Sequence, residues 1–207
     1  MPSITDFDEK AKTWDSDPVK IARAFAMAEG IRNHLPSSSQ LVGLEYGCGT
    51  GLLSFALLPH FKEITLADSS AGMLAVLVEK IAATGVTKMK PVMLNLESDP
   101  LPAEKYDVIY TAMTLHHVAD ADKLLYDFYA ILDSPGHLCI VDLDSEDGSF
   151  HGSDFTGHKG FDRDELRRKA QEAGFRNIHF TTIFQITKGE GPGQTDFPLF
   201  LMVAEKI

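Results

Sequence analysis

A glycine-rich run at residues 45–51, with the sequence EYGCGTG, is the part of this chain whose residue types and spacing point most directly to chemistry. Glycine has no Cβ, so the backbone can turn sharply there and approach a ligand closely. The run follows a short apolar segment and precedes a helical pattern, and the start of a helix presents unpaired N–H groups to a bound molecule. The alternative is a tight strand-to-helix turn that binds nothing.

The spacing of the glycines separates the candidate ligands. A dinucleotide fingerprint, G-x-G-x-x-G, would place its third glycine at the position of Leu52. Here the order is G-x-G-x-G, and the acidic Glu45 precedes it. No G-K-[ST] follows, so a Walker A phosphate loop is absent. A nicotinamide-dependent oxidoreductase therefore remains only as a rival that Leu52 disfavours.

A second acidic residue, Asp68, follows the next apolar segment, about twenty residues beyond the first glycine. At that distance a carboxylate can accept hydrogen bonds from both hydroxyls of a ribose. Asp68 opens the run DSSAGML at residues 68–74, which leads into a helical pattern. The alternative for this residue is an N-cap of that helix.

Together these two runs resemble motifs of the class I S-adenosylmethionine-dependent methyltransferases, in which an acid precedes G-C-G-T-G and D-x-S-x-x-M-L follows the second strand. The resemblance implies that the backbone at Gly47 and Gly49 approaches the methionine part of the cofactor. It also implies that Glu45 holds the cofactor ammonium group, directly or through water. Met73 would lie against the adenine, and Asp68 would bind the ribose.

The segment 94–102, LNLESDPLP, departs from the same family at one position. The family commonly carries an aspartate after the third strand, which accepts from the adenine amino group, and the matching residue here is Asn95. An amide oxygen can still accept this bond, although without charge assistance. Asp99 or Glu97 takes the role if the register differs.

The segment 106–118, YDVIYTAMTLHHV, is similar to the stretch after the family's fourth strand. Backbone near Thr111 and Ala112 is expected to border the cofactor. An N-P-P-[YF] sequence is absent, which weakens a nucleic-acid or amide-nitrogen methylase function. The expected cofactor-binding residues are Glu45, Tyr46, Gly47, Gly49, Asp68, Ser69, Met73, Asn95, Leu96 and Thr111.

The adjacent His116 and His117 could supply a general base, since the ordinary pKa of histidine suits proton removal near neutral pH. The alternative is that His117 hydrogen-bonds backbone and fixes its loop. Further possible metal ligands are scattered over several loops without ligand spacing, so no metal is expected: Asp142, Asp144, His151 and His158. No catalytic side chain is nominated, because transfer from an activated sulfonium needs mainly alignment and exclusion of water.

Two further segments are expected near an acceptor. The loop 144–160, rich in glycine, aspartate and histidine, is either a wall of the site or a disordered connection. Near the start of the chain, Phe7 and Trp14 could close over the site as a lid. Plain packing of the first helix is the alternative for Trp14.

Short apolar runs alternate with helical patterns through most of the chain, which indicates right-handed βαβ units. The predicted fold is α/β, a Rossmann-like three-layer sandwich with a mostly parallel seven-stranded sheet and an antiparallel C-terminal strand. Ligands of such sheets bind beyond the carboxyl ends of the strands. The expected strands are 41–45, 63–67, 90–94, 106–110, 137–141, 177–186 and 198–204, and the clearest helices are 18–35, about 51–59, one from about Ser70, and 162–174.

We expect one domain over residues 1–207, with a helical cap at 1–39, a cofactor-binding core at 40–145, and a substrate loop, helix and strand pair at 146–207. In the helix 18–35, the apolar stripe is Ile21, Phe25, Ala28, Ile31 and Leu35. Asp162 and Glu165 are expected to cap the helix after the loop. The basic residues 167–169 are expected on a solvated helix face.

The chain of 207 residues carries 19 Lys and Arg against 30 Asp and Glu, a formal charge of −11. This balance argues against a nucleic-acid partner, so a small-molecule acceptor and direct displacement are expected, with S-adenosylmethionine as cofactor. Two cysteines, no signal-peptide pattern and no membrane-spanning run predict a cytoplasmic protein. A non-catalytic cofactor-binding protein, or methylation of protein or RNA, stays open, as does the oligomeric state.

Overall fold

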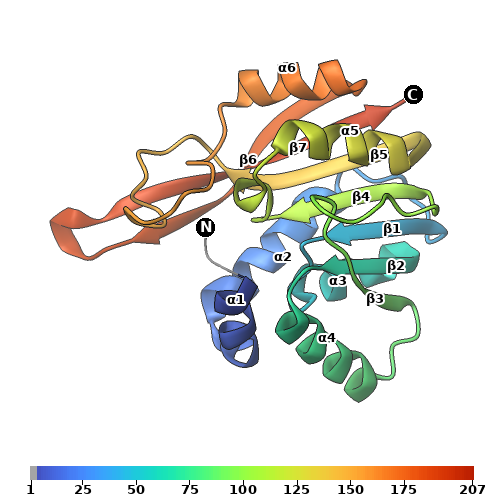
Figure 1. The fold of residues 1–207 in the computed structure, drawn as a ribbon, viewed down its shortest axis with the longest axis horizontal. Helices are drawn as coiled ribbons and strands as arrows, with labels where there is room; N and C mark the ends of the chain where they lie inside the picture. Colours follow the sequence, from blue (N-terminus) through green and yellow to red (C-terminus); the bar gives the residue numbers. More distant parts are fainter. Residues whose placement is uncertain (1–3) are drawn as a thin grey trace.

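All seven strands of the computed structural model, which describes residues 4–207, belong to one sheet (Figure 1). Their order is β3-β2-β1-β4-β5-β7-β6. The first five run parallel, and β7 is antiparallel to both β5 and β6. This topology confirms the predicted fold class. The strands are β1 (Leu41–Tyr46), β2 (Phe61–Asp68), β3 (Met89–Met93), β4 (Tyr106–Ala112), β5 (Leu132–Leu143), β6 (Arg176–Lys188) and β7 (Thr195–Lys206).

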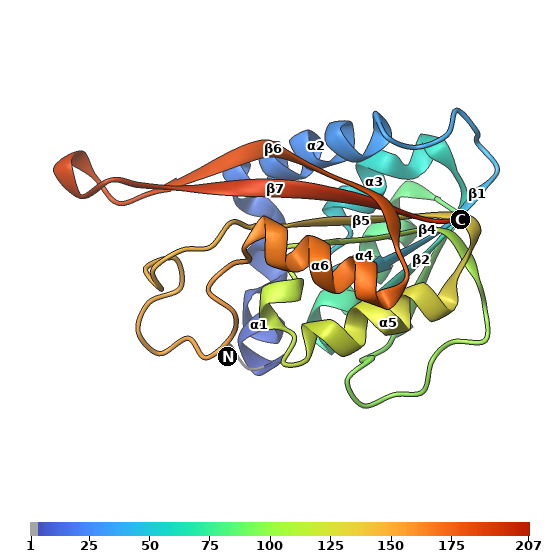
Figure 2. The same ribbon diagram turned by 90° about the horizontal axis from the view of Figure 1, so that it is seen from above.

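Helices cover both faces of the sheet, as Figure 2 shows for α2 and α3 on one side and α5 and α6 on the other. Buried side chains of α2, α3 and α4 share one apolar core, and those of α5 and α6 share a second. The helices are α1 (Ile4–Lys10), α2 (Pro18–Arg32), α3 (Leu52–Leu57), α4 (Ala71–Thr84), α5 (Ala121–Ile131) and α6 (Arg163–Ala173), with short 3-10 turns η1 (Ala11–Ser16), η2 (Leu58–His60), η3 (Leu115–His117) and η4 (Gly191–Gly193).

The central strands are apolar on both sides because each side meets a helical layer. In β5, Leu138 and Ile140 belong to the core under α5 and α6. The alternate residues Cys139 and Val141 belong to the core under α2 to α4. In the central strands, the buried polar side chains Glu45, Thr111 and Asp142 therefore lie at or near the carboxyl ends, where the site lies.

Helix ends follow the capping residues in the sequence. The side chain of Asp162 accepts hydrogen bonds from the N–H groups of Asp164 and Glu165, which confirms Asp162 as the N-cap of α6. Glu165 itself pairs with Lys169, at 3.3 Å. The basic residues of this helix form ion pairs with acidic neighbours, as expected for a solvated face.

The apolar stripe expected on the first long helix is wrong at two positions, since Leu35 lies beyond the end of α2 and Phe25 is directed outward. Phe25 is 64% exposed, whereas Ala24, Met27 and Ile31 are buried. The helix approaches the sheet so closely that a Cβ on Gly30 would lie 3.2 Å from the side chain of Ile183. A close approach favours small residues at the interface, so the larger ring is directed outward.

Several elements differ in length from those expected. The helix predicted at 18–35 ends at Arg32. The strand predicted to begin at residue 137 begins at Leu132, which pairs with Tyr106 of β4. The strands β6 and β7 form a hairpin that extends well beyond the helices (Figures 1 and 2). Among residues 4–207, no helix has the length and apolar character needed to cross a membrane.

Candidate active site

A cavity of about 670 Å³ opens at the carboxyl ends of β1, β2 and β4. Pockets for small ligands have volumes of about 300–1,000 Å³, so this cavity is large enough for a cofactor-sized molecule. Eight of the ten expected cofactor-binding residues line it, namely Glu45, Tyr46, Gly47, Gly49, Asp68, Ser69, Met73 and Asn95.

The glycine loop joins β1 to α3 and forms one wall of the cavity. Its path is held by two backbone hydrogen bonds, since the N–H groups of Gly47 and Cys48 both donate to the carbonyl of Ala67, at 2.8 and 3.0 Å. Gly47 has a φ of +72°. A Cβ there would lie 2.3 Å from Oγ1 of Thr114, so only glycine fits.

Gly47→Ala is therefore expected to unfold at a lower urea concentration than the wild type and to lose cofactor affinity. Gly85→Ala is the matched control, because Gly85 has a similar φ of +67° and nothing within 4 Å of an added Cβ. The free energy of unfolding of the control should fall only by the roughly 1–2 kcal/mol that a left-handed conformation costs a residue with a Cβ. Equal urea midpoints for the two variants would show that the contact with Thr114 is unimportant.

Glu45 lies at the end of β1 and is 3% exposed. Its carboxylate accepts a hydrogen bond from Ser54 of α3, whose Oγ also lies 2.6 Å from the hydroxyl of Tyr110. Burial raises the pKa of Glu45 to about 8. Among residues 4–207, no Lys or Arg forms an ion pair with it. A buried acid that lacks a cationic partner and lines a cavity fits a site for a cationic group of a ligand.

Asp68 ends β2 and connects the loop to the next helix. One carboxylate oxygen accepts from the N–H of Gly49, at 2.7 Å, and the other accepts from the N–H of Ser70, at 2.8 Å. The N-cap of α4 is Ser70, whose Oγ accepts from the N–H of Met73, so Asp68 is not the cap. Burial raises the pKa of Asp68. Met73 is 2% exposed and presents its side chain to the cavity wall.

Asn95 follows β3 in a tight turn. Its side-chain oxygen accepts from the backbone N–H of Glu97, at 3.0 Å, and its backbone N–H donates to the carboxylate of Asp99, at 2.8 Å. Glu97 also lines the cavity but accepts from the N–H of Ala119, whereas Asp99 does not line it. The structure thus brings Asn95 and Glu97, but not Asp99, to the expected adenine end.

Two of the expected residues do not line this cavity. Leu96 is 1% exposed, and its N–H donates to the hydroxyl of Tyr46, at 3.1 Å. Thr111 is fully buried within β4, and its Oγ1 has no hydrogen-bond partner among residues 4–207. Both stand behind the wall rather than on it. For Thr111 the reason is that the side chains of a strand alternate between its faces, whereas Leu96 lies in the turn after β3 and packs into the apolar core.

The N-terminal segment covers one side of the cavity. Phe7 of α1 and Trp14 of η1 both line it, and the ring of Phe7 lies 6.2 Å from that of Trp14 and 5.4 Å from that of His117. Trp14 also lies under the ammonium group of Lys20, at 3.8 Å. These positions fit the lid that the sequence suggested.

Two aspartates hold this segment against the core, and sequence reasoning missed them. Asp8 accepts from the hydroxyl of Ser70, at 2.6 Å, and from the N–H of Gly72, at 2.7 Å. Asp15 forms an ion pair with Lys80 of α4 at 2.5 Å. The partners named here lie 62 to 65 residues away, so no local spacing could reveal these contacts.

Histidines gather on the part of the cavity wall next to Phe7. His116 is buried, and its Nδ1 lies 2.6 Å from a carboxylate oxygen of Asp142 in β5. The N–H of His117 donates to the carbonyl of Thr114, at 2.9 Å. Hence His116, rather than His117, is the histidine whose ring is fixed by a side-chain hydrogen bond.

His151 approaches the same wall from the loop after β5. Its ring stacks on that of Phe155, with centroids 4.0 Å apart. Burial, together with the neighbouring histidines, lowers the pKa of His117 to about 3 and the pKa of His151 to about 4. Both rings are therefore neutral near pH 7.

The loop between β5 and α6 forms a wall of the cavity, where Phe150 and His151 line it. Its course is fixed by backbone hydrogen bonds, including one from the N–H of His158 to the carbonyl of His116, at 2.9 Å. Arg163 anchors the loop by a bidentate contact with Asp144, with both distances 2.6 Å. Phe155, in the same loop, stacks on His151 and does not line the cavity.

The sheet order, the glycine loop at the end of β1 and the acid at the end of β2 together define a class I methyltransferase fold. The chain belongs to a methyltransferase domain family, whose model matches residues 20–180. The family implies S-adenosylmethionine as methyl donor.

Known proteins with similar sequences are also methyltransferases. The chain is 28% identical over 128 residues to an uncharacterised methyltransferase of Schizosaccharomyces pombe, covering 58% of this chain and 45% of the relative. It is 33% identical over 104 residues to a ubiquinone/menaquinone biosynthesis C-methyltransferase of Pseudoalteromonas translucida, covering 48% and 41%. The chain thus spans less than half the length of these two curated relatives.

Among solved structures, a putative methyltransferase of Haloferax volcanii, determined in complex with the Trm112 methyltransferase activator, has a similar fold. Its TM-score is 0.76 at 16% identity, and the match covers 97% of both chains. At this level of identity the likeness establishes the fold alone.

Proposed function

We propose that this chain is an S-adenosylmethionine-dependent methyltransferase that acts on a small-molecule acceptor by direct displacement. The observation that carries the proposal is a single cavity with two different halves. One half is lined by the glycine loop, Glu45 and Asp68, and the other by aromatic and histidine side chains of the N-terminal segment, η3 and the loop after β5. A donor and an acceptor can therefore meet within one space.

The residues of the first half would hold the cofactor along its length. Glu45 and the backbone of the glycine loop would bind the amino-acid end, and Asp68 with Ser69 would bind the ribose. Met73 and Asn95 would contact the adenine. When bound, the cofactor supplies a methyl group already activated on a sulfonium.

Tyr46, Leu96 and Thr111 would act mainly as supports in this proposal. The hydroxyl of Tyr46 joins the end of β1 to the turn after β3 through the N–H of Leu96, and its ring packs edge-on against Phe128, with centroids 5.6 Å apart. Such contacts keep the glycine loop and the adenine turn at a fixed separation, which alignment of the reacting groups requires.

The second half would bind and enclose the acceptor. Phe7, Trp14 and Phe150 supply apolar surface that excludes water. Arg23 and Lys188 line the cavity as well, and burial lowers the pKa of each. These cations favour an acceptor that carries an acidic group as well as the atom to be methylated.

We also propose a single domain over residues 1–207 and a cytoplasmic location. The first is supported by the participation of both the N-terminal segment and the loop after β5 in one cavity. The second is supported by the two cysteines, Cys48 and Cys139, which are free and buried.

The proposal is tested by incubating the purified chain with methyl-labelled S-adenosylmethionine and a panel of small hydroxy-, thio- and amino-acids, and measuring labelled product and released S-adenosylhomocysteine. Turnover with at least one acceptor is expected. Binding of the cofactor without turnover on any acceptor would instead support a non-catalytic cofactor-binding protein. NADH titrated in parallel should give no fluorescence change.

A further inference from the structure

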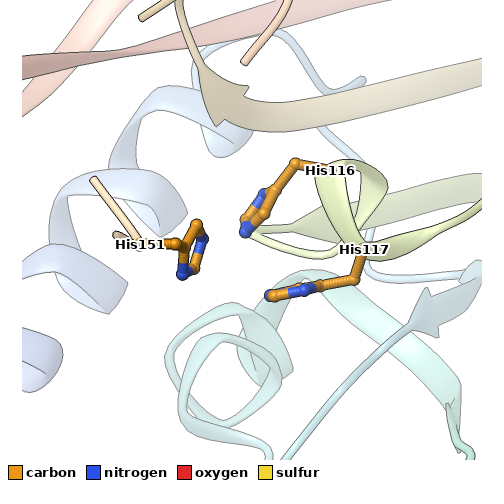
Figure 3. A group of neighbouring side chains, drawn as sticks. All are labelled: His116, His117 and His151. Atoms are coloured by element: carbon orange, nitrogen blue, oxygen red, sulfur yellow. The ribbon is translucent and has the colours of Figure 1, made fainter. Parts of the chain in front are cut away.

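Three imidazole rings converge at the acceptor half of the cavity. His116 and His117 come from η3 after β4, and His151 comes from the loop after β5; Figure 3 shows the rings turned toward a common space. One ring nitrogen of each residue lies within 4.8 Å of the corresponding nitrogens of the other two. Residues 34 positions apart in the chain thus form one compact group of nitrogen donors.

The buried histidine of this group has an unsatisfied nitrogen. The Nδ1 of His116 is occupied by Asp142, so its Nε2 is the free donor or acceptor, and this atom is buried without a partner among residues 4–207. The Nδ1 of His117 is also buried without a hydrogen-bond partner among residues 4–207. A buried polar atom without a partner costs about 1–3 kcal/mol. Two such atoms, in rings whose centroids lie 4.1 Å apart, point to a ligand that satisfies both.

The position of Asp142 identifies the kind of ligand. Its side chain is fully buried and also accepts from the backbone N–H groups of His116 and Leu143, at 3.2 and 2.8 Å. A carboxylate that fixes the tautomer and orientation of a histidine from behind is the usual support of a histidine that ligates a metal. With Nδ1 held as the N–H, the Nε2 of His116 presents a lone pair to the cavity.

We propose that His116, His117 and His151 bind one divalent transition-metal ion, with zinc as the preferred ion and Asp142 as the supporting carboxylate. Three imidazoles with an open fourth position form a recurring zinc arrangement, whereas magnesium and calcium prefer oxygen ligands. Tetrahedral zinc–nitrogen bonds of about 2.0–2.1 Å place nitrogens about 3.4 Å apart. The rings therefore need to approach one another by about 1.4 Å at most.

One further feature favours this site. His151 lies on a loop and is less buried than His116, so its ring can adjust to an ion, while the ring of His116 is already fixed.

The use of the ion rests on the proposed function. Since all three histidines line the cavity, the fourth coordination position would face the acceptor. A hydroxyl or thiol bound there would have a lowered pKa and would release its proton to solvent, leaving the oxygen or sulfur as the nucleophile. The inferred acceptor class is thus a small hydroxyl or thiol compound.

The experiment uses the full chain with any purification tag removed and the metal stripped by a chelator. Zinc is titrated calorimetrically against a competing chelator, bound zinc is counted by mass spectrometry, and cobalt substitution is followed by visible absorption. One zinc per chain and the absorption bands of tetrahedral cobalt are expected. His151→Gln should weaken zinc binding by roughly 100-fold or more, since loss of even a supporting residue costs about 10–100-fold.

His158→Gln is the matched control, because His158 belongs to the same loop, its ring packs on Phe161, and it is outside the group of three. It should bind zinc as the wild type does. Absence of zinc binding in the wild type, or equal affinity in the two variants, would overturn the proposal. The affinity of the metal-free chain for S-adenosylhomocysteine, measured separately, distinguishes this failure from failure of the proposed function.

Discussion

Asp68→Asn is expected to weaken binding of S-adenosylhomocysteine by about 100-fold. The carboxylate would accept from the ribose hydroxyls while it holds the N–H groups of Gly49 and Ser70. Hydrogen bonds to a charged acceptor contribute about 1.5–3 kcal/mol each, and about 2.8 kcal/mol corresponds to 100-fold. In the variant, the side-chain NH2 of asparagine would also face one of those two backbone N–H groups, so that one of the two hydrogen bonds is lost. Titration calorimetry of both proteins measures the effect.

Asp107→Asn is the matched control for this prediction. Asp107 is also a carboxylate that accepts a backbone N–H, that of Val42 at 2.7 Å, but it lies at the start of β4, opposite the cavity. Its replacement should lower stability without changing cofactor affinity. Equal affinity losses in both variants would indicate a general effect on the sheet and would contradict a ribose role for Asp68.

Glu45→Gln is expected to lower cofactor affinity by at least about 30-fold, because the amide keeps the contact with Ser54 but carries no charge for the cofactor ammonium group. The wild-type carboxyl has a pKa of about 8 and must ionise to pair with that cation. Wild-type affinity should therefore rise between pH 6 and 8, with a proton released on binding. Calorimetry in buffers of different ionisation enthalpy detects the proton, and the variant should show neither effect.

The same variant should be more stable than the wild type above pH 5 in the absence of ligand. The unfolded chain ionises Glu45 near pH 4.5, whereas the folded chain retains the proton up to about pH 8. The unfolded state therefore binds fewer protons across this window, and wild-type stability falls as pH rises through it. Glutamine removes this loss, on the order of 2–4 kcal/mol at pH 8. Urea unfolding at pH 4.5 and pH 8 measures it, and an equal difference at both pH values would contradict the buried-acid assignment.

Local sequence patterns were sufficient to place the residues that line the half of the cavity proposed for the cofactor. The glycine loop, Asp68 and Met73 each lie at the junction of a strand with a helix, so their positions follow from the order of elements. Asn95 reaches the cavity because it follows the carboxyl end of β3. Leu96 and Thr111 are next to residues that line the cavity, but which side chains face the cavity depends on the tertiary structure.

The acceptor half depends on contacts between distant segments. Asp8 and Asp15 hold the N-terminal segment through partners in α4 and in the loops before α3 and α4, and His151 reaches His116 only because the loop after β5 folds back. Neither contact has a periodic or spaced signature. The exposure of Phe25 has a related cause, since the close approach of α2 to β6 and β7 is a property of the packed chain.

Calorimetric titration of the purified chain with S-adenosylmethionine and S-adenosylhomocysteine tests the central claim most directly. Binding at micromolar concentrations to one site per chain is expected, together with a thermal stabilisation that increases with ligand concentration. An absence of heat with both ligands, together with an unchanged melting temperature, would contradict the assignment of the cavity to this cofactor.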